Sequence, residues 1–161
     1  MDGSPRVFPG WKSALTLTAA FVVTSLAVFS PAIGGGFLSW DDELLVTRND
    51  NLRQINATTL KNIFTTYDPE LYIPLTFVSY QVDTAVGGGG PAVFHVHNVV
   101  LHAINALLVV WLLWVLLDAG WIAAACGLLF LLHPLNAEAA SWISARPACS
   151  PSECPLPWHP A

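Results

Sequence analysis

The run VVLHAINALLVVWLLWVLL, residues 99–117, carries no charged side chain and decides what kind of fold this chain forms. Two other runs share this property, at residues 14–32 and 121–133. As a helix, residues 14–32 rise about 28 Å, which matches the hydrocarbon core of a bilayer. We therefore predict transmembrane helices over 14–32, 95–117 and 121–133, and an extension of the third helix to residue 143 stays open.

Composition indicates the same class of protein. Hydrophobic residues make up 54% of the 161 residues and charged residues 11%, whereas about a quarter of a soluble domain is charged. The net charge of -5 leaves no basic face that could neutralise the phosphates of a nucleic acid. Seven tryptophans suit the two membrane interfaces. The sequence predicts an all-α, multi-pass integral membrane protein of about one domain.

The charges near the N-terminus predict the topology. Arg6 and Lys12 precede the first apolar run, so the positive-inside rule places residues 1–13 in the cytoplasm. This run is longer than the roughly 7–15 apolar residues of a signal peptide, which favours an uncleaved span. Residues 33–94 then form an external loop.

We expect this external loop to be structured. Apolar residues recur at spacings of four and three over residues 70–86, which predicts an amphipathic helix. That helix is too short to span a bilayer and would lie along the interface. A second short helix is expected over residues 58–66.

The acidic stretch Asp41-Asp42-Glu43 follows the glycines of residues 34–36 and allows two interpretations. It could begin a solvated helix, with Ser39 as the N-cap and the acids favoured by the helix dipole. Alternatively, carboxylates at the mouth of a membrane segment could accept protons, hold a cation or orient a polar substrate.

Polar residues form a stripe along the second predicted span. Asn98, His102 and Asn105 follow His95 at spacings of three, four and three, which places all four on one helix face. Such a stripe can join helices by hydrogen bonds or line a cavity below the acidic loop. His133 and Glu138 form a second candidate patch at the end of the third span.

The three cysteines suggest no metal site. Cys126 lies in an apolar run, and the spacing of Cys149 and Cys154 matches no zinc pattern. We expect neither a metal nor another cofactor.

Several short blocks occur in one order and together resemble a known family. They are FLSWDD (37–42), LKNIFT (60–65), YIPLT (72–76), the stripe from His95 to Asn105, HPLNAE (133–138) and WISAR (142–146). No single block is specific, but the ordered set is similar to the N-terminal part of multi-spanning glycosyltransferases of the GT-C type. The transmembrane and tetratricopeptide-repeat-containing O-mannosyltransferases and their bacterial relatives resemble it most.

The resemblance implies transfer of a sugar, mannose in the better-known members, from a polyprenyl-phosphate donor to a serine or threonine hydroxyl of a protein. It implies a site on the lumenal side of the endoplasmic reticulum or the periplasmic side of a bacterial inner membrane. Asp41 or Asp42 would act as the base while the other orients a substrate. The residues implied in substrate binding are His102, Asn105, His133, Glu138 and Arg146.

The sequence departs from the family after Arg146. Family members continue there with further apolar spans and often with tetratricopeptide repeats, whereas residues 147–161 contain five prolines and favour no helix. We therefore expect a truncated piece of the enzyme that is inactive alone. The alternative is a small, non-catalytic, multi-pass membrane protein that binds partner helices through the polar stripe.

Overall fold

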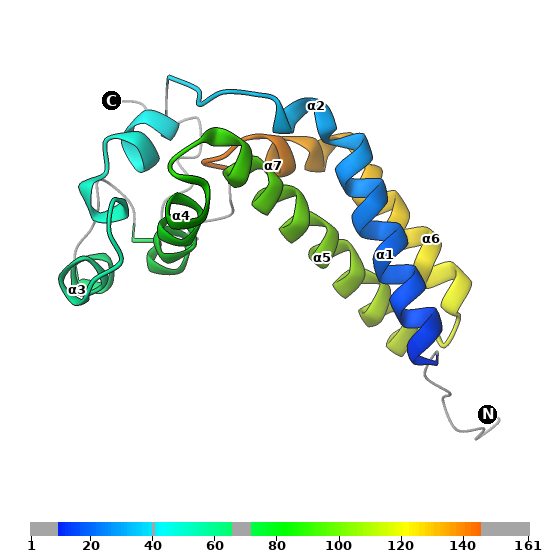
Figure 1. The fold of residues 1–161 in the computed structure, drawn as a ribbon. Helices are drawn as coiled ribbons and strands as arrows, with labels where there is room; N and C mark the ends of the chain where they lie inside the picture. The colour runs from blue at the N-terminus through cyan, green and yellow to red at the C-terminus, as the bar shows by residue number, and fades with distance from the viewer. Residues whose placement is uncertain (1–9, 40, 66–71, 146–161) are drawn as a thin grey trace, which may run out of the picture.

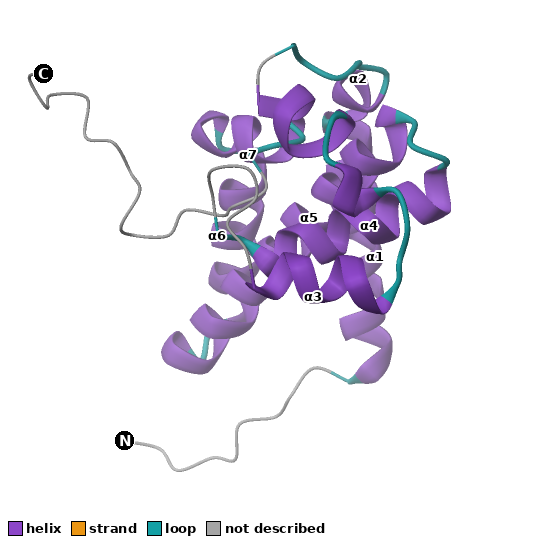
Figure 2. Ribbon diagram, turned by 90° about the vertical axis from the view of Figure 1, so that its left-hand side faces the viewer, coloured by secondary structure: helices purple, strands orange, loops and turns teal. Residues whose placement is uncertain are grey.

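The computed structural model describes residues 10–39, 41–65 and 72–145. In that part of the chain every regular element is a helix, as Figure 1 and Figure 2 show. Arg146 and the proline-rich tail lie outside the described residues, as does most of the expected segment 1–13. The prediction of an all-α membrane protein is confirmed.

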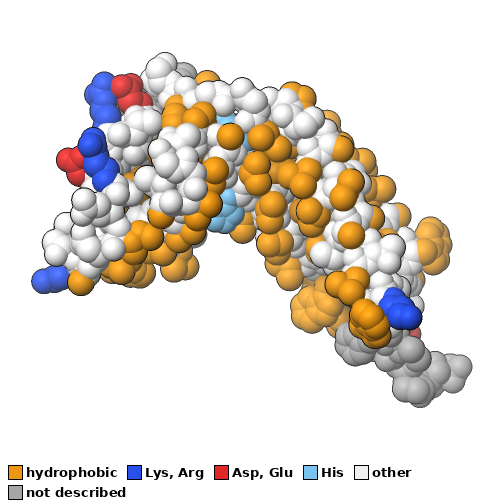
Figure 3. All heavy atoms as spheres, viewed as in Figure 1, with side chains coloured by type: hydrophobic (Ala, Val, Ile, Leu, Met, Phe, Trp, Pro, Cys, Tyr) orange, Lys and Arg blue, Asp and Glu red, His pale blue; other side chains and the backbone are white. Residues whose placement is uncertain are grey.

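The helices form an arch with two limbs (Figure 1). We call α1 (Trp11–Val28), α5 (Pro91–Leu117) and α6 (Gly120–Leu132) the membrane limb, because they pack side by side and are apolar. Residues 35–39, residues 41–65 and α4 (Pro74–Gly87) form the loop limb. On the visible face, acidic and basic side chains gather mainly on the loop limb, and hydrophobic side chains cover much of the membrane limb (Figure 3).

Two helices, α1 and α5, are long and apolar enough to cross a bilayer. A third crossing exists if α6 and residues Pro134–Ser141 are one span bent by 55°. The helix is interrupted there for a local reason, because Pro134 has no N–H with which to continue the helical hydrogen bonds. The third span predicted over 121–133 is therefore helical only to Leu132. The residues that follow, toward residue 143, run at an angle to α6.

The ends of the other helices also follow from local chemistry. The first run forms α1 and a short α2 (Ser30–Ile33). Helix α5 begins at Pro91, four residues before the expected start, because proline suits the first turn of a helix. It ends at Leu117, where Asp118 adopts a left-handed conformation with φ 52° and donates its N–H to the Trp114 carbonyl.

Close packing joins α5 and α6. A Cβ atom added at Gly127 would overlap the Val110 side chain and lie 3.1 Å from the Ala106 carbonyl oxygen. Gly127 therefore allows the two backbones to approach, as small residues do between membrane helices. Phe21 of α1 is buried in one hydrophobic cluster with Ala106 and Val110 of α5.

The loop limb has its own hydrophobic core. The two helices expected over residues 58–66 and 70–86 are present as α3 (Ala57–Thr65) and α4, with bounds that differ by one to four residues. Phe94 at the start of α5 and Ile143 near the end of the described chain complete the core, which therefore joins distant parts of the sequence. Its buried members are Leu45, Val46, Leu52, Ile63, Ile73, Phe77, Tyr80, Phe94 and Ile143.

Candidate functional site

The two aspartates of the acidic stretch have opposite environments. Asp42 is 1% exposed, and both of its carboxylate oxygens accept hydrogen bonds from backbone N–H groups. Oδ2 binds the N–H of Leu38 at 2.9 Å, and Oδ1 binds the N–H of Ser144 at 3.0 Å. Because a buried carboxylate needs such donors, Asp42 fixes the acidic stretch to a segment 102 residues further along the chain.

Asp41 is exposed and has no hydrogen-bond or ion-pair partner within the described part of the chain. Glu43 pairs with Arg48. The three acids do begin a helical segment, because residues 41–42 are helical and lead into the π-helix Glu43–Thr47. This helix start is not simply solvated, since Asp42 is buried and accepts a hydrogen bond from the preceding Leu38 N–H. Of the two neighbouring aspartates, Asp41 is the one that can meet a substrate.

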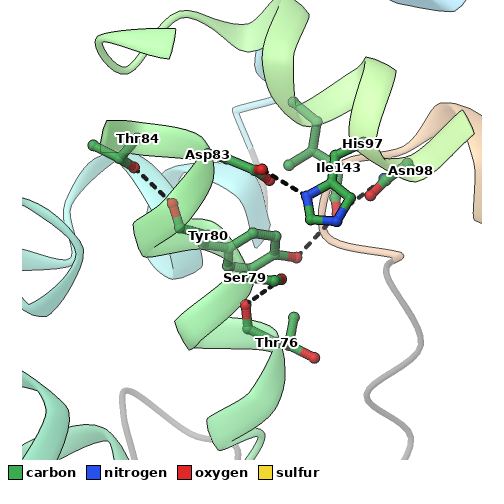
Figure 4. A network of polar contacts seen from close by, with 8 residues as sticks. All are labelled: Thr76, Ser79, Tyr80, Asp83, Thr84, His97, Asn98 and Ile143. Carbon is green, nitrogen blue, oxygen red and sulfur yellow. Dashed lines mark hydrogen bonds and ion pairs between the residues drawn. The ribbon is translucent and has the colours of Figure 1, made fainter. Parts of the chain in front are cut away.

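Three elements converge on residues 142–144, just after α7 (Ala137–Ser141). The Tyr80 hydroxyl of α4 donates to the Ile143 carbonyl at 3.0 Å (Figure 4). The Asn98 amide of α5 donates to the Trp142 carbonyl at 2.9 Å. Asp42 binds the next N–H of the segment, that of Ser144. These residues lie outside a helix, so their backbone groups need partners, and side chains from the acidic stretch, α4 and α5 supply them.

The polar stripe of α5 mostly faces the protein interior. His95, Asn98 and His102 are buried, whereas Asn105 is exposed. The Nε2 atom of His102 lies 3.1 Å from the carbonyl oxygen of Leu131 in α6, so this nitrogen carries the proton and donates. His102 therefore acts here as a hydrogen-bonded link between two helices.

His102 can bind the Leu131 carbonyl because the backbone hydrogen bonds of α6 end at this point. Leu135 would normally donate to the Leu131 carbonyl, but its N–H points to Nδ1 of His133 at 3.3 Å. Pro134 lies between them and has no N–H. The break therefore frees the Leu131 carbonyl for His102 and uses His133 as the cap of the 3-10 turn Pro134–Asn136.

Three other residues implied in substrate binding lie at the surface. His133, Glu138 and Asn105 are exposed. Among the described residues, no hydrogen bond or ion pair links them to Asp41 or Asp42. Arg146 lies outside the described residues. The structure thus joins Asp42 to residues 142–144, and the proposed roles of the other residues stay predictions.

His95 has unused hydrogen-bonding capacity. It is 5% exposed, and neither ring nitrogen has a hydrogen-bond partner among the described residues. The glycine segment before the acids lies against the ring, because a Cβ atom at Gly35 would be 3.4 Å from Nε2. In the described part of the chain, no three His, Cys, Asp or Glu side chains lie close enough to hold a metal ion.

A hydrogen-bonding contact between a half-buried histidine of α5 and a buried aspartate of α4 was not anticipated from the sequence. Nδ1 of His97 lies 2.6 Å from Oδ1 of Asp83, whose side chain is 4% exposed (Figure 4). His97 is off the polar stripe, which is why the spacing did not single it out. One pattern could have identified the pair, namely an acid and a histidine on either side of the glycine turn 87–90, because a helical hairpin brings such positions together.

About half of the chain is similar to curated protein O-mannosyl-transferases. It is 34% identical over 84 residues to Protein O-mannosyl-transferase Tmtc2 of Drosophila melanogaster, a match covering 52% of this chain and 9% of that protein. It is 36% identical over 75 residues to TMTC2 of Homo sapiens, covering 47% and 9%. With Tmtc1 of Drosophila melanogaster the identity is 31% over 83 residues, covering 52% and 10%.

The matched region spans about a tenth of the length of these relatives. No family model matches the chain, and no solved structure matches it. The chain therefore resembles one part of the O-mannosyl-transferases.

Proposed function

We propose that this chain is part of an integral-membrane glycosyltransferase that transfers a mannose-like sugar from a polyprenyl-phosphate donor to a hydroxyl group of a protein. The observation that carries the proposal is the similarity of about half the chain to protein O-mannosyl-transferases. The geometry supports it, because an exposed carboxylate stands next to a buried one that holds its backbone in place.

In this proposal Asp41 is the general base. A serine or threonine hydroxyl is a weak nucleophile, and a positioned carboxylate can take its proton as the oxygen attacks the sugar. The new bond joins that oxygen to the anomeric carbon, and the bond from this carbon to the lipid phosphate breaks. The electron pair leaves with the phosphate, which is already a stable anion, so no acid is needed to expel it.

Asp42 is a positioning residue in the same scheme. Both of its oxygens already accept hydrogen bonds from the backbone, and its burial leaves no room for a substrate. Its contribution is to hold the segment that carries Asp41 against residues 142–144. Catalysis depends on such placement, because displacements of about 1 Å can reduce rates about a hundredfold.

The proposed substrate-binding residues contribute in different ways. The planar guanidinium of Arg146 suits a phosphate, and Glu138 suits the hydroxyl groups of the sugar, since a carboxylate repels phosphate. Exposure leaves His133 and Asn105 accessible. His102 is already bonded to Leu131, so its part is to hold together the helices that flank the site.

The alternative, a non-catalytic protein that binds partner helices, keeps one supporting observation. Asn105 is exposed on α5 within an apolar run, and a polar amide facing lipid gains from a partner helix. The polar stripe as a whole is not available to a partner helix, because His95, Asn98 and His102 are buried within this chain. Helix binding would therefore depend on Asn105.

A hybrid protein tests the proposed function. This chain would replace the matching segment of Drosophila Tmtc2, and the hybrid would be assayed in membranes with radiolabelled polyprenyl-phosphate mannose and a threonine-containing protein acceptor. We expect transfer by the hybrid and a loss of about 10²-fold or more with Asp41→Asn, the usual contribution of a general base. The membrane level of each variant is the control.

Normal transfer by Asp41→Asn would exclude the base role. A hybrid that inserts normally but transfers nothing would contradict the proposed function. In that case, loss of helix association with Asn105→Leu but not with Asp41→Asn would support the binding alternative.

A further inference from the structure

The chain contains one sequence of the type that accepts N-linked glycans, Asn56-Ala57-Thr58. In such a sequon the side-chain nitrogen of the asparagine receives the sugar, and the hydroxyl two residues later completes the recognition sequence. Three residues alone are a weak signal, because the pattern also occurs by chance. A working site also needs exposed reacting groups and a position outside the cytoplasm.

The sequon lies at the surface, at the start of α3. All of residues 55–58 are exposed, although Leu52 and Ile63 on either side of them belong to the core of the loop limb. Helix α3 lies at the end of the loop limb that is furthest from the membrane limb (Figure 1). A bulky, hydrated glycan can therefore be attached here without displacing a packed side chain.

The amide of Asn56 keeps its nitrogen available. Its Oδ1 accepts a hydrogen bond at 2.9 Å from the N–H of Thr59 and so caps α3. Only the amide oxygen can accept this bond, and Nδ2 has no hydrogen-bond partner in the described part of the chain. An N-glycosidic bond uses Nδ2 and leaves Oδ1 unchanged, so the cap is compatible with the modification.

The two threonines after Asn56 have different environments. The hydroxyl of Thr59 donates to the Gln54 carbonyl at 2.7 Å and accepts from the Gln81 amide at 3.1 Å, so it joins α3 to α4. Thr58 is exposed, and no other described residue hydrogen-bonds its hydroxyl. The sequon requires the hydroxyl of Thr58, and this is the one that the fold leaves available.

The expected topology places the sequon on the side where N-glycans are attached. Asn56 lies between α1 and α5, the two helices long and apolar enough to cross a bilayer. Arg6 and Lys12 favour a cytoplasmic N-terminus, so the segment after α1 lies on the opposite side. The relatives described above are animal proteins, and animal cells attach N-glycans in the lumen of the endoplasmic reticulum.

We propose that Asn56 carries an N-linked oligosaccharide. The donor is an oligosaccharide on a polyprenyl diphosphate, and the catalyst is an oligosaccharyltransferase of the cell, not this chain. Nδ2 gives one proton to a base of that enzyme and bonds to the anomeric carbon of the sugar. The bond from this carbon to the diphosphate oxygen breaks, and its electron pair leaves with the lipid diphosphate. This modification does not depend on the sugar transfer proposed for Asp41.

Translation of the complete chain in the presence of endoplasmic-reticulum microsomes tests the proposal. We expect a band of slower migration in gel electrophoresis, which an endoglycosidase specific for N-glycans returns to the position of the unmodified chain. One step is expected, because the chain has one sequon. An N-terminal epitope tag reports the topology, and a protease added to sealed microsomes should remove it while the glycosylated segment stays protected.

Two variants and one control separate the sequon from the helix cap. Asn56→Asp keeps an oxygen for the Thr59 N–H and is an equally good cap, but it lacks the nitrogen and should abolish the slower band. Thr58→Val removes the hydroxyl and should also abolish it. Thr58→Ser is the matched control, because it keeps a hydroxyl at this position and should retain the band.

Absence of the slower band from membrane-inserted wild-type chains would overturn the proposal, whichever orientation the tag reports. A slower band that persists in Asn56→Asp would also overturn it, because the sugar would then be attached elsewhere. The readout requires no sugar transfer by this chain. An inactive hybrid protein would therefore contradict the proposed function and leave the glycosylation of Asn56 unaffected.

Discussion

In the membrane limb α6 approaches α5 through Gly127, and apolar side chains fill the space between the helices. In the loop limb buried polar side chains, Asp42 and Tyr80 among them, bind backbone groups of residues 142–144. The first limb satisfies most of its backbone within each helix, with the Leu131 carbonyl bound by His102 as an exception. The second limb must satisfy irregular backbone with specific side chains.

This contrast predicts where single substitutions matter most. In the membrane limb many apolar contacts share the stabilisation, and an exchange between apolar residues of similar volume is tolerated. In the loop limb a few bonds join residues far apart in the sequence, so the loss of one partner leaves a buried donor or acceptor unpaired. The candidate site lies in this second limb, next to those bonds.

The largest expected effect is that of Asp42→Ala. It removes both carboxylate bonds and leaves the N–H groups of Leu38 and Ser144 without their partner, at a cost of about 3 kcal/mol or more in the stability of the loop limb. Hydrogen exchange should accelerate over residues 37–65 while α5 stays protected. Asp41→Ala is the matched control and should change exchange little, because Asp41 is exposed. Equal protection in both variants would contradict the role of Asp42.

Gly127→Val tests the membrane limb and should have the next largest effect. The added side chain meets Val110 and the Ala106 carbonyl, and such overpacking costs about 1–3 kcal/mol. Unfolding in mixed detergent micelles would measure the loss. If the limbs are independent, exchange over residues 37–65 will stay at the wild-type rate. Accelerated exchange there would show that α5 couples the two limbs.

The sequence predicts the helices better than the contacts between them. Uncharged runs identify α1, α5 and α6, and periodic apolar residues identify α4, because burial in lipid or a core imposes those patterns. The break at Pro134 has a local cause, yet the 55° bend between α6 and Pro134–Ser141 depends on packing and could not be derived.

The site was predicted only in part, for a similar reason. The sequence marks Asp41 and Asp42 as candidates, but they are adjacent and chemically identical. Which carboxylate is free depends on the N–H of Ser144, 102 residues away from Asp42. The contact of Asp83 with His97 likewise needs the hairpin between α4 and α5, and no helical spacing within one segment reveals it.

Tyr80→Phe measures a single long-range bond of the loop limb. The change keeps the ring in the core and removes the shorter of two bonds to the Ile143 carbonyl, to which the Asn98 amide also donates at 3.4 Å. The expected loss of stability is about 1 kcal/mol. Chemical denaturation followed by hydrogen exchange at residues 142–144 would detect it. Tyr72→Phe provides a comparison, because the Tyr72 hydroxyl donates to the Phe64 carbonyl at an exposed position and should contribute less.

His102→Leu measures the corresponding bond in the membrane limb and should have the smallest effect. Leucine keeps much of the apolar volume against Phe29 and Phe130 but cannot donate to the Leu131 carbonyl. Hydrogen bonds between membrane helices contribute about 0.6 kcal/mol on average, because polar groups also find partners in the unfolded state within the membrane. Unfolding in mixed micelles, with Asn105→Leu as the exposed control, gives this value. If His102→Leu lost more stability than Tyr80→Phe, the order of effects proposed for the two limbs would be reversed. The hydrogen bond between α5 and α6 would then be the stronger of the two.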